Sequence, residues 1–219
     1  MKYAIFFLFA FLFAAIGPLN AQVTIRLDNP SFEDEPRHSV QPRGWEDRGF
    51  HGESPPDTHP SGDFGVTQKP FHGQSYLGMV VRDNDTWECV AQEIDQPMRK
   101  DSCYRLILHA CQSPHYVSIS RVTGKEVNFN QPCRLRLWGA RKKGGKGYEL
   151  LAETPLVDHE DWQRYTLSFT PTMDITYIYM EAYYSSDGVG PYNGNVLVDG
   201  MSGIVECGVP DSAASGGEN

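Results

Sequence analysis

The sequence predicts an all-β protein, folded as a two-sheet sandwich or a barrel. Short runs that alternate in polarity, or that are rich in β-branched and aromatic residues, recur along the chain. Gly, Pro, Asn and Asp separate these runs, and beyond the first residues almost nothing has the 3.6-residue period of an amphipathic helix. A succession of strands without helices leaves these two architectures.

The predicted strands follow one another along the chain. They are residues 23–27, 75–81, 86–94, 103–111, 133–139, 149–153, 162–169, 174–184 and 195–200. Residues 34–70, which are rich in proline, are expected to form an ordered surface loop, and residues 112–132 a second long excursion. We assign the histidines of "HGESPPDTHP" (51–60) to that surface loop, because no regular spacing would hold a metal there.

Side chains two residues apart on a strand share one face of the sheet. In "CRLRLW", Leu135 and Leu137 share one face, and Arg134, Arg136 and Trp138 the other. In "ITYIYMEAYY", the apolar face carries Ile178, Met180 and Ala182, and the opposite face Tyr177, Tyr179, Glu181 and Tyr183. In "CYRLILHAC", Arg105 and His109 point away from the apolar side chains. Three strands therefore offer aromatic or charged side chains on the face that points away from the core.

The first residues have the pattern of an export signal. Lys2 precedes an apolar run at 4–16, which is shorter than the roughly 20 residues of a membrane span, and Ala21 ends a stretch of small residues. We predict a signal peptide at 1–21, a β-sandwich binding module at 22–207 and a disordered tail at 208–219. The alternative is an uncleaved N-terminal anchor. The predicted location is the periplasm, the cell surface or the extracellular space, with no membrane span in the mature chain.

Charge and cysteine content limit the partners. The net charge is −9 at pH 7 and no long basic stretch occurs, so nucleic acid and anionic membranes are poor partners, whereas neutral ligands and cations fit better.

The five cysteines are Cys89, Cys103, Cys111, Cys133 and Cys207. An odd number leaves at least one thiol unpaired. Cys103 and Cys111 lie about 26 Å apart on one predicted strand and cannot pair, and the other pairings stay open.

Several short motifs occur in an order that is typical of one family. They are "NPSFE" (29–33), "GWED" (44–47), "GQSYLGMVV" (73–81), "VAQEI" (90–94), "CYRLILHA" (103–110), "DWQRYTLSFTP" (161–171) and "NVLVDGMSGI" (195–204). Together they resemble the carbohydrate-binding modules of the CenC type, and longer phrases resemble exported proteins of the Bacteroidetes. The resemblance implies an antiparallel jelly-roll sandwich of the galactose-binding-like fold, with a non-catalytic role.

The same resemblance implies a structural calcium ion. In such modules an ion commonly ties the first strand to the last, and Glu33 and Asp199 occupy the matching positions in this chain. Calcium prefers six to eight oxygen ligands, which a loop and a strand end can supply. Gly200 departs from the family pattern, which often has a second acid there. The alternative is an acidic turn without metal.

The leading functional prediction is glycan recognition on an aromatic sheet face. Trp138, Tyr177, Tyr179 and Tyr183 would stack on sugar rings, and Arg136, Glu181 and Asn195 would hydrogen-bond to the hydroxyl groups. The expected partner is a glycan or cell-surface polysaccharide. One alternative is an adhesion or assembly subunit of the cell envelope that covers this face with a protein partner. The other is a glycoside-active enzyme using Glu181, although no second carboxylate is evident.

Overall fold

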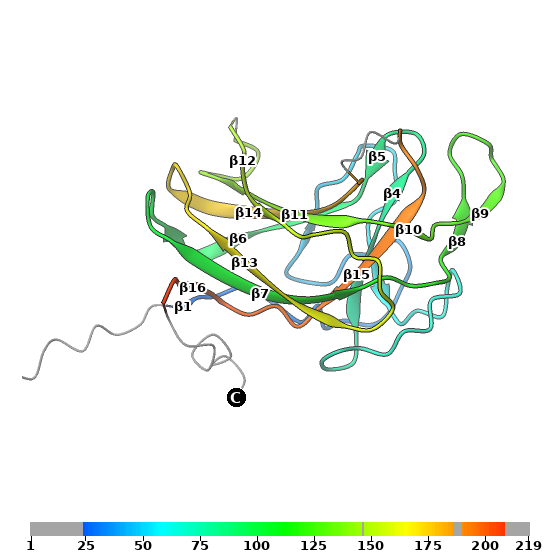
Figure 1. Cartoon of the computed structure of the whole chain (residues 1–219), viewed down its shortest axis with the longest axis horizontal. Coiled ribbons are helices and arrows are strands. Elements are labelled where there is room, and N and C mark those ends of the chain that lie inside the picture. Colours follow the sequence, from blue (N-terminus) through cyan, green and yellow to red (C-terminus); the bar gives the residue numbers. More distant parts are fainter. Residues whose placement is uncertain (1–23, 146, 186–189, 209–219) are drawn as a thin grey trace, which may run out of the picture.

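The computed structural model describes residues 24–145, 147–185 and 190–208. Within these ranges the chain forms strands, turns and irregular segments without an α-helix, and so without a helix that could cross a membrane. Two sheets form the body of the molecule, and a separate hairpin stands at one end (Figure 1). The predicted all-β sandwich is confirmed. The predicted signal peptide, and the predicted tail except for Gly208, lie outside the described residues.

The larger sheet is built around three central strands. Its order is β1 (Thr24–Ile25), β16 (Ile204–Glu206), β7 (Tyr104–Cys111), β15 (Gly194–Asp199), β4 (Tyr76–Arg82) and β3 (Asp57–His59). Three further strands extend it: β13 (Gln163–Phe169) pairs with β7, β5 (Thr86–Trp87) with β4, and β10 (Gln131–Pro132) with β15. The β10–β15 pairing is parallel and the others are antiparallel.

The second sheet has five antiparallel strands. Their order is β12 (Glu149–Glu153), β11 (Arg134–Ala140), β14 (Ile175–Tyr183), β6 (Cys89–Met98) and β2 (Glu46–Asp47). The separate hairpin consists of β8 (Val117–Ile119) and β9 (Glu126–Asn128). It lies within residues 112–132, which were predicted as a long excursion without strands of its own.

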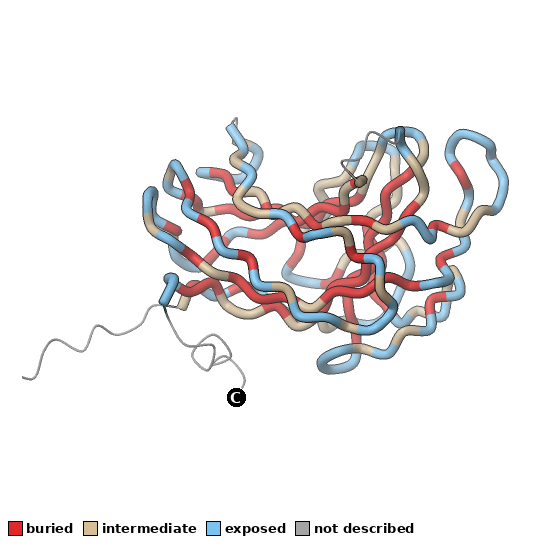
Figure 2. Tube along the Cα trace, viewed as in Figure 1, coloured by how far each residue is buried: buried red, intermediate tan, exposed pale blue. Residues whose placement is uncertain are grey.

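The hydrophobic core lies between the two sheets and takes alternate side chains from each. Figure 2 shows the buried residues along the strands of both sheets. The five-stranded sheet contributes Val90, Leu135, Leu137, Ile178, Met180 and Ala182, and the larger sheet contributes Leu77, Met79, Val81, Leu106, Leu108, Val196 and Val198. Each fully buried aliphatic side chain of this kind contributes roughly 1.5–3 kcal/mol. The faces predicted for β7, β11 and β14 are confirmed, so the opposite face of the five-stranded sheet is left for function.

The strand predicted at 86–94 is divided between the two sheets. β5 pairs with β4 of the larger sheet, whereas β6 pairs with β14 of the five-stranded sheet. Between them, the Glu88 N–H donates to the Val80 carbonyl, and the Glu88 carbonyl accepts from the Ala182 N–H. The chain therefore crosses from one sheet to the other at Glu88. This crossing places Trp87 at the margin of both sheets.

Part of the segment predicted as a surface loop at 34–70 is buried. Trp45 is 4% exposed and its ring lies 5.2 Å from that of Phe32. β3 forms the edge of the larger sheet, and His59 within it is fully buried, so the surface-loop prediction is wrong for these residues. The sequence of β3 is polar and therefore does not resemble a buried strand. Its polar side chains are nevertheless buried because they form hydrogen bonds inside the protein: Asp57 with the Tyr116 hydroxyl and Thr58 with the Val40 carbonyl.

One disulfide joins Cys103 and Cys207, whose Cα atoms lie 5.4 Å apart. Cys89, Cys111 and Cys133 are free and buried, so the prediction that Cys103 and Cys111 do not pair is confirmed. The bridge ties the segment after β16 to the start of β7. Because it links residues 104 apart in sequence, it removes considerable chain entropy from the unfolded state.

Candidate functional site

The outer face of the five-stranded sheet carries the candidate site. β14 places Tyr177, Tyr179 and Glu181 on this face, because the residues between them are buried in the core. β11 pairs with β14 in a register that sets Trp138 opposite Tyr179. β6, on the other side of β14, sets Cys89 opposite Glu181. Three neighbouring strands thus bring aromatic rings and one carboxylate together.

These side chains line a pocket of about 450 Å³, termed here the aromatic pocket. Its described lining is Arg48, Gly49, Phe50, Trp87, Cys89, Trp138, Tyr148, Tyr179 and Glu181. Strand residues form the floor, whereas the segment after β2 and the segment before β12 contribute Phe50 and Tyr148 as walls. The volume is in the range of roughly 300–1,000 Å³ that is usual for pockets that bind small ligands.

Glu181 is the polar centre of the aromatic pocket. Trp138 donates its indole N–H to Oε1 at 2.9 Å, and Trp87 donates its own to Oε2 at 2.8 Å. Burial raises the pKa of Glu181, and the two indole donors and the charge of Arg136 oppose the rise. The two tryptophans therefore hold the carboxylate in place and stabilise its charged form.

The remaining rings stand as walls at steep angles to one another. Phe50 meets Trp87 at 4.7 Å between centroids and an interplanar angle of 80°, and Tyr148 meets Tyr179 at 4.9 Å and 84°. Edge-to-face contacts of this kind are favourable for aromatic pairs. Lys143 also contacts Glu46 at 2.6 Å and so links the segment after β11 to β2. The walls are thus tied to each other and to the sheet.

Three of the predicted ligand-binding residues lie on this face but do not line the pocket. Tyr177 is 2% exposed and packs 5.1 Å from Tyr179, so its ring is not available for stacking, contrary to the prediction. Tyr183 is covered by the Arg136 guanidinium, which lies 3.4 Å above its ring centroid. Arg136 also donates to the Glu153 carboxylate at 3.1 Å. These residues support the edge of the pocket.

The prediction for Asn195 is wrong. It lies on β15 of the larger sheet, fully buried, and its amide donates to the Ser113 and Phe129 carbonyls and accepts from the Ser113 N–H. Its role is to fasten the segment that leads to the β8–β9 hairpin. β7, with His109, also belongs to the larger sheet, so this strand does not extend the aromatic face. Two-residue alternation shows which side chains share a strand face, but it does not show which strands share a sheet.

Six of the nine described lining residues were not among the predicted ligand-binding residues: Arg48, Gly49, Phe50, Trp87, Cys89 and Tyr148. Trp87 lies on β5 of the larger sheet, yet its indole reaches Glu181 on the other sheet because the chain crosses between the sheets at Glu88. Strand alternation alone does not show this crossing. Arg48, Phe50 and Tyr148 lie in irregular segments, where no periodicity marks a functional side chain.

The residues predicted to bind calcium already accept hydrogen bonds. Asp199, fully buried, accepts from the Ser31 hydroxyl at 2.9 Å, the His72 N–H at 2.9 Å and the Gly200 N–H at 2.6 Å. Glu33 accepts from the Gln74 N–H through both oxygens. Within the described ranges no three His, Cys, Asp or Glu side chains cluster to hold a metal ion. N–H and O–H donors thus point at the oxygens that a calcium ion would use, and calcium binding stays a prediction.

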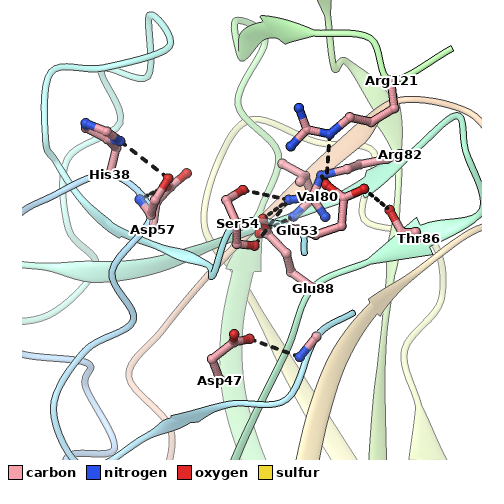
Figure 3. A network of polar contacts seen from close by, with 12 residues as sticks. His38, Asp47, Glu53, Ser54, Asp57, Val80, Arg82, Thr86, Glu88 and Arg121 are labelled. Carbon is pink, nitrogen blue, oxygen red and sulfur yellow. Dashed lines mark hydrogen bonds and ion pairs between the residues drawn. The ribbon is translucent and has the colours of Figure 1, made fainter. Parts of the chain in front are cut away.

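A second group of charged side chains lies beside the β8–β9 hairpin, and Arg82 and Glu88 within this group are buried (Figure 3). Arg82, 3% exposed, contacts the Glu88 carboxylate and lies 3.6 Å from that of Glu53. Arg121, in the hairpin turn, donates to Glu53 at 2.8 Å. The adjoining cavity is about 20 Å³, enough for one water molecule and too small for a sugar. We assign this group a structural role in holding the hairpin.

Comparisons with solved structures agree with this architecture. A cyclase from Fischerella sp. TAU has a TM-score of 0.50 and 13% identity, over 85% of this chain and 98% of that chain. The K2 cleaved adhesin domain of Lys-gingipain has a TM-score of 0.50 and 10% identity, over 80% and 96%. The CBM22-1 xylan-binding domain of Xyn10C from Paenibacillus barcinonensis has a TM-score of 0.48 and 15% identity, over 87% and 99%.

At these identities the likeness of the cyclase and of the adhesin domain shows the fold alone, and no conclusion is drawn from the xylan-binding domain, whose TM-score is below 0.5. Carbohydrate-binding modules are among the similar structures, together with proteins described as a cyclase and an adhesin. A scan against protein-family models gave no match, and a search of curated proteins gave none either. The function must therefore be argued from the aromatic pocket.

Proposed function

We propose that this protein is an exported, non-catalytic carbohydrate-binding module of the CenC type, which holds glycan in the aromatic pocket. The observation that carries the proposal is the convergence of Trp87, Trp138 and Tyr179 around the Glu181 carboxylate. Sugar rings have apolar C–H faces that stack on aromatic planes, and their hydroxyl groups donate to carboxylates. The pocket offers both kinds of contact within one sugar-sized volume.

The lining of the pocket favours binding over glycoside hydrolysis. A glycosidase commonly needs two carboxylates about 5–9.5 Å apart on either side of the scissile bond. Among the described residues that line the aromatic pocket, Glu181 is the one carboxylate, and both its oxygens accept indole N–H groups. It is therefore suited to orient a ligand.

Isothermal titration against a panel of neutral and charged oligosaccharides tests the proposal. The matched variants are Trp138→Ala, which removes a pocket ring, and Trp162→Ala, which removes a partly buried ring that packs elsewhere, near Tyr76. We expect the wild type and Trp162→Ala to bind and Trp138→Ala to lose about tenfold or more in affinity. Equal affinity in the two variants, or no binding of any oligosaccharide by the wild type, would contradict the proposal.

The hairpin favours a second candidate function, adhesion to a protein of the cell envelope. Val117, Ile119 and Val122 are 40%, 43% and 67% exposed on one short hairpin, which is an unusual concentration of apolar surface. Pull-down from envelope extracts with the wild type and with a Val117→Ser/Ile119→Ser variant would distinguish the two functions. A stoichiometric partner that the variant loses, and that added glycan does not displace, would favour adhesion.

A further inference from the structure

The negative charge of Glu181 has no ion-pair partner among the described residues. Its two hydrogen bonds come from neutral indole groups. Arg136 faces it across the β11–β14 pair, but its guanidinium is directed to the Glu153 carboxylate and the Tyr183 ring. The charge of Arg136 lowers the pKa of Glu181 from this distance, but it forms no direct ion pair with the carboxylate. Burial of a carboxylate without a direct ion pair is costly, and a ligand that carries a cation would offset this cost.

The other charged residue of the pocket does not fill this role. Arg48 lies in the lining, but its Nη2 contacts the Glu46 carboxylate at 2.5 Å, and Lys143 contacts the same carboxylate. The thiol of Cys89 and the hydroxyl of Tyr179 have pKa values raised by burial and stay neutral. Of the two charged residues that line the pocket, Arg48 is therefore paired within the protein and Glu181 is the one without a direct ion pair.

The walls of the pocket suit the same kind of ligand. Five rings line the pocket together with the carboxylate: Phe50, Trp87, Trp138, Tyr148 and Tyr179. A cation over an aromatic face is attracted by the ring quadrupole, and tryptophan is the strongest partner. Perpendicular ring pairs enclose such a group from more than one side. Each carboxylate oxygen also keeps about one lone-pair site beyond its indole bond, which an N–H donor can use.

We propose that the aromatic pocket recognises an ammonium group carried on a sugar, so that its preferred ligand is a deacetylated amino-sugar chain. The proposal rests on the glycan-binding function proposed above and specifies the ligand class. An N-acetylated or neutral sugar can still donate a hydrogen bond to Glu181, but it forms neither the ion pair nor the cation–π contact. A free quaternary ammonium compound offers the same charge without the sugar.

Isothermal titration of the full chain with four probes tests the proposal, at a pH where the amines are protonated. The probes are a β-1,4-linked glucosamine tetramer, its N-acetylated counterpart, cellotetraose and choline. We expect the glucosamine tetramer to bind about tenfold or more tightly than the N-acetylated tetramer and cellotetraose. Choline binding as tight as that of the glucosamine tetramer would support ammonium recognition and identify a free ammonium compound as the ligand source.

Two results would overturn the inference in distinguishable ways. Equal affinity for cellotetraose and the glucosamine tetramer would refute ammonium recognition while supporting glycan binding. Failure of all four probes to bind would reject both. These outcomes need only the wild-type protein, so they do not depend on whether a variant folds.

A pair of variants then assigns the preference to Glu181. Glu181→Gln removes the charge and keeps the shape, and Glu93→Gln makes the same change at an exposed position on the neighbouring strand β6. We expect Glu181→Gln, checked for folding by its thermal melt, to lose the preference for the glucosamine tetramer and Glu93→Gln to keep it. A preference that survives in Glu181→Gln would exclude the carboxylate as its source.

Discussion

The hydrogen bond from Trp138 to Glu181 gives a prediction with a pH signature. Trp138→Phe removes the indole N–H that lies 2.9 Å from Oε1 and keeps an aromatic ring. A hydrogen bond to a charged group contributes about 1.5–3 kcal/mol, and one between neutral groups about 0.5–1.5 kcal/mol. We therefore expect the variant to lose about 2 kcal/mol of unfolding free energy at pH 7. Burial raises the pKa of Glu181, which favours its neutral form as the pH falls, so we expect a smaller loss, about 1 kcal/mol or less, near pH 4.

Urea unfolding at the two pH values measures this difference. The matched control is Trp162→Phe, which removes an indole donor to a neutral acceptor, the Lys69 carbonyl at 2.8 Å. Its cost is expected to be about the same at both pH values. If Trp138→Phe also loses the same free energy of unfolding at pH 7 and pH 4, the indole contributes through packing and the electrostatic explanation is refuted.

Three further predictions concern stability. Burial lowers the pKa of His59 from 6.5 to about 4, so its contribution to stability is complete above about pH 6.5 and is lost as the pH falls towards 4. In urea titrations over this range, the free energy of unfolding of the wild type should fall by about 3 kcal/mol more than that of His59→Gln. A variant at the exposed His51 should follow the wild type. Replacing Cys103 and Cys207 with serine should lower the free energy of unfolding by about 2–5 kcal/mol, and reduced wild type should match the variant; a loss below about 1 kcal/mol would contradict the entropic reasoning. If calcium binds as the family resemblance implies, the melting temperature of the wild type should be higher in calcium than in EDTA, and that of Asp199→Asn should be the same in both. Equal melting temperatures of the wild type in calcium and in EDTA would exclude the site.

The regular strands were predictable because their side chains obey a strict period. β12 has the predicted bounds of 149–153, and the alternation in β11 and β14 correctly separates Leu137 from Trp138 and Met180 from Tyr179. Side chains alternate between the two faces of a strand, so an alternation of apolar and polar residues within one strand shows which face is buried. For these strands, the sequence was sufficient to identify the face that carries the candidate site.

Features that depend on long-range pairing were not predictable. Asn195 was placed with Trp138 although their strands belong to different sheets, because alternation carries no information about the partner strand. The crossing at Glu88 divided one apparent strand into two. The walls formed by Phe50 and Tyr148 come from irregular segments, whose conformation is set by contacts with distant residues.

The separate origins of floor and walls have a consequence for engineering. The strands that carry Trp138 and Glu181 also hold the core on their reverse side, so they tolerate little change. The wall residues Phe50 and Tyr148 are 39% and 50% exposed and contribute little to that core. Libraries randomised at these two positions would therefore yield a repertoire of specificities on one unchanged scaffold.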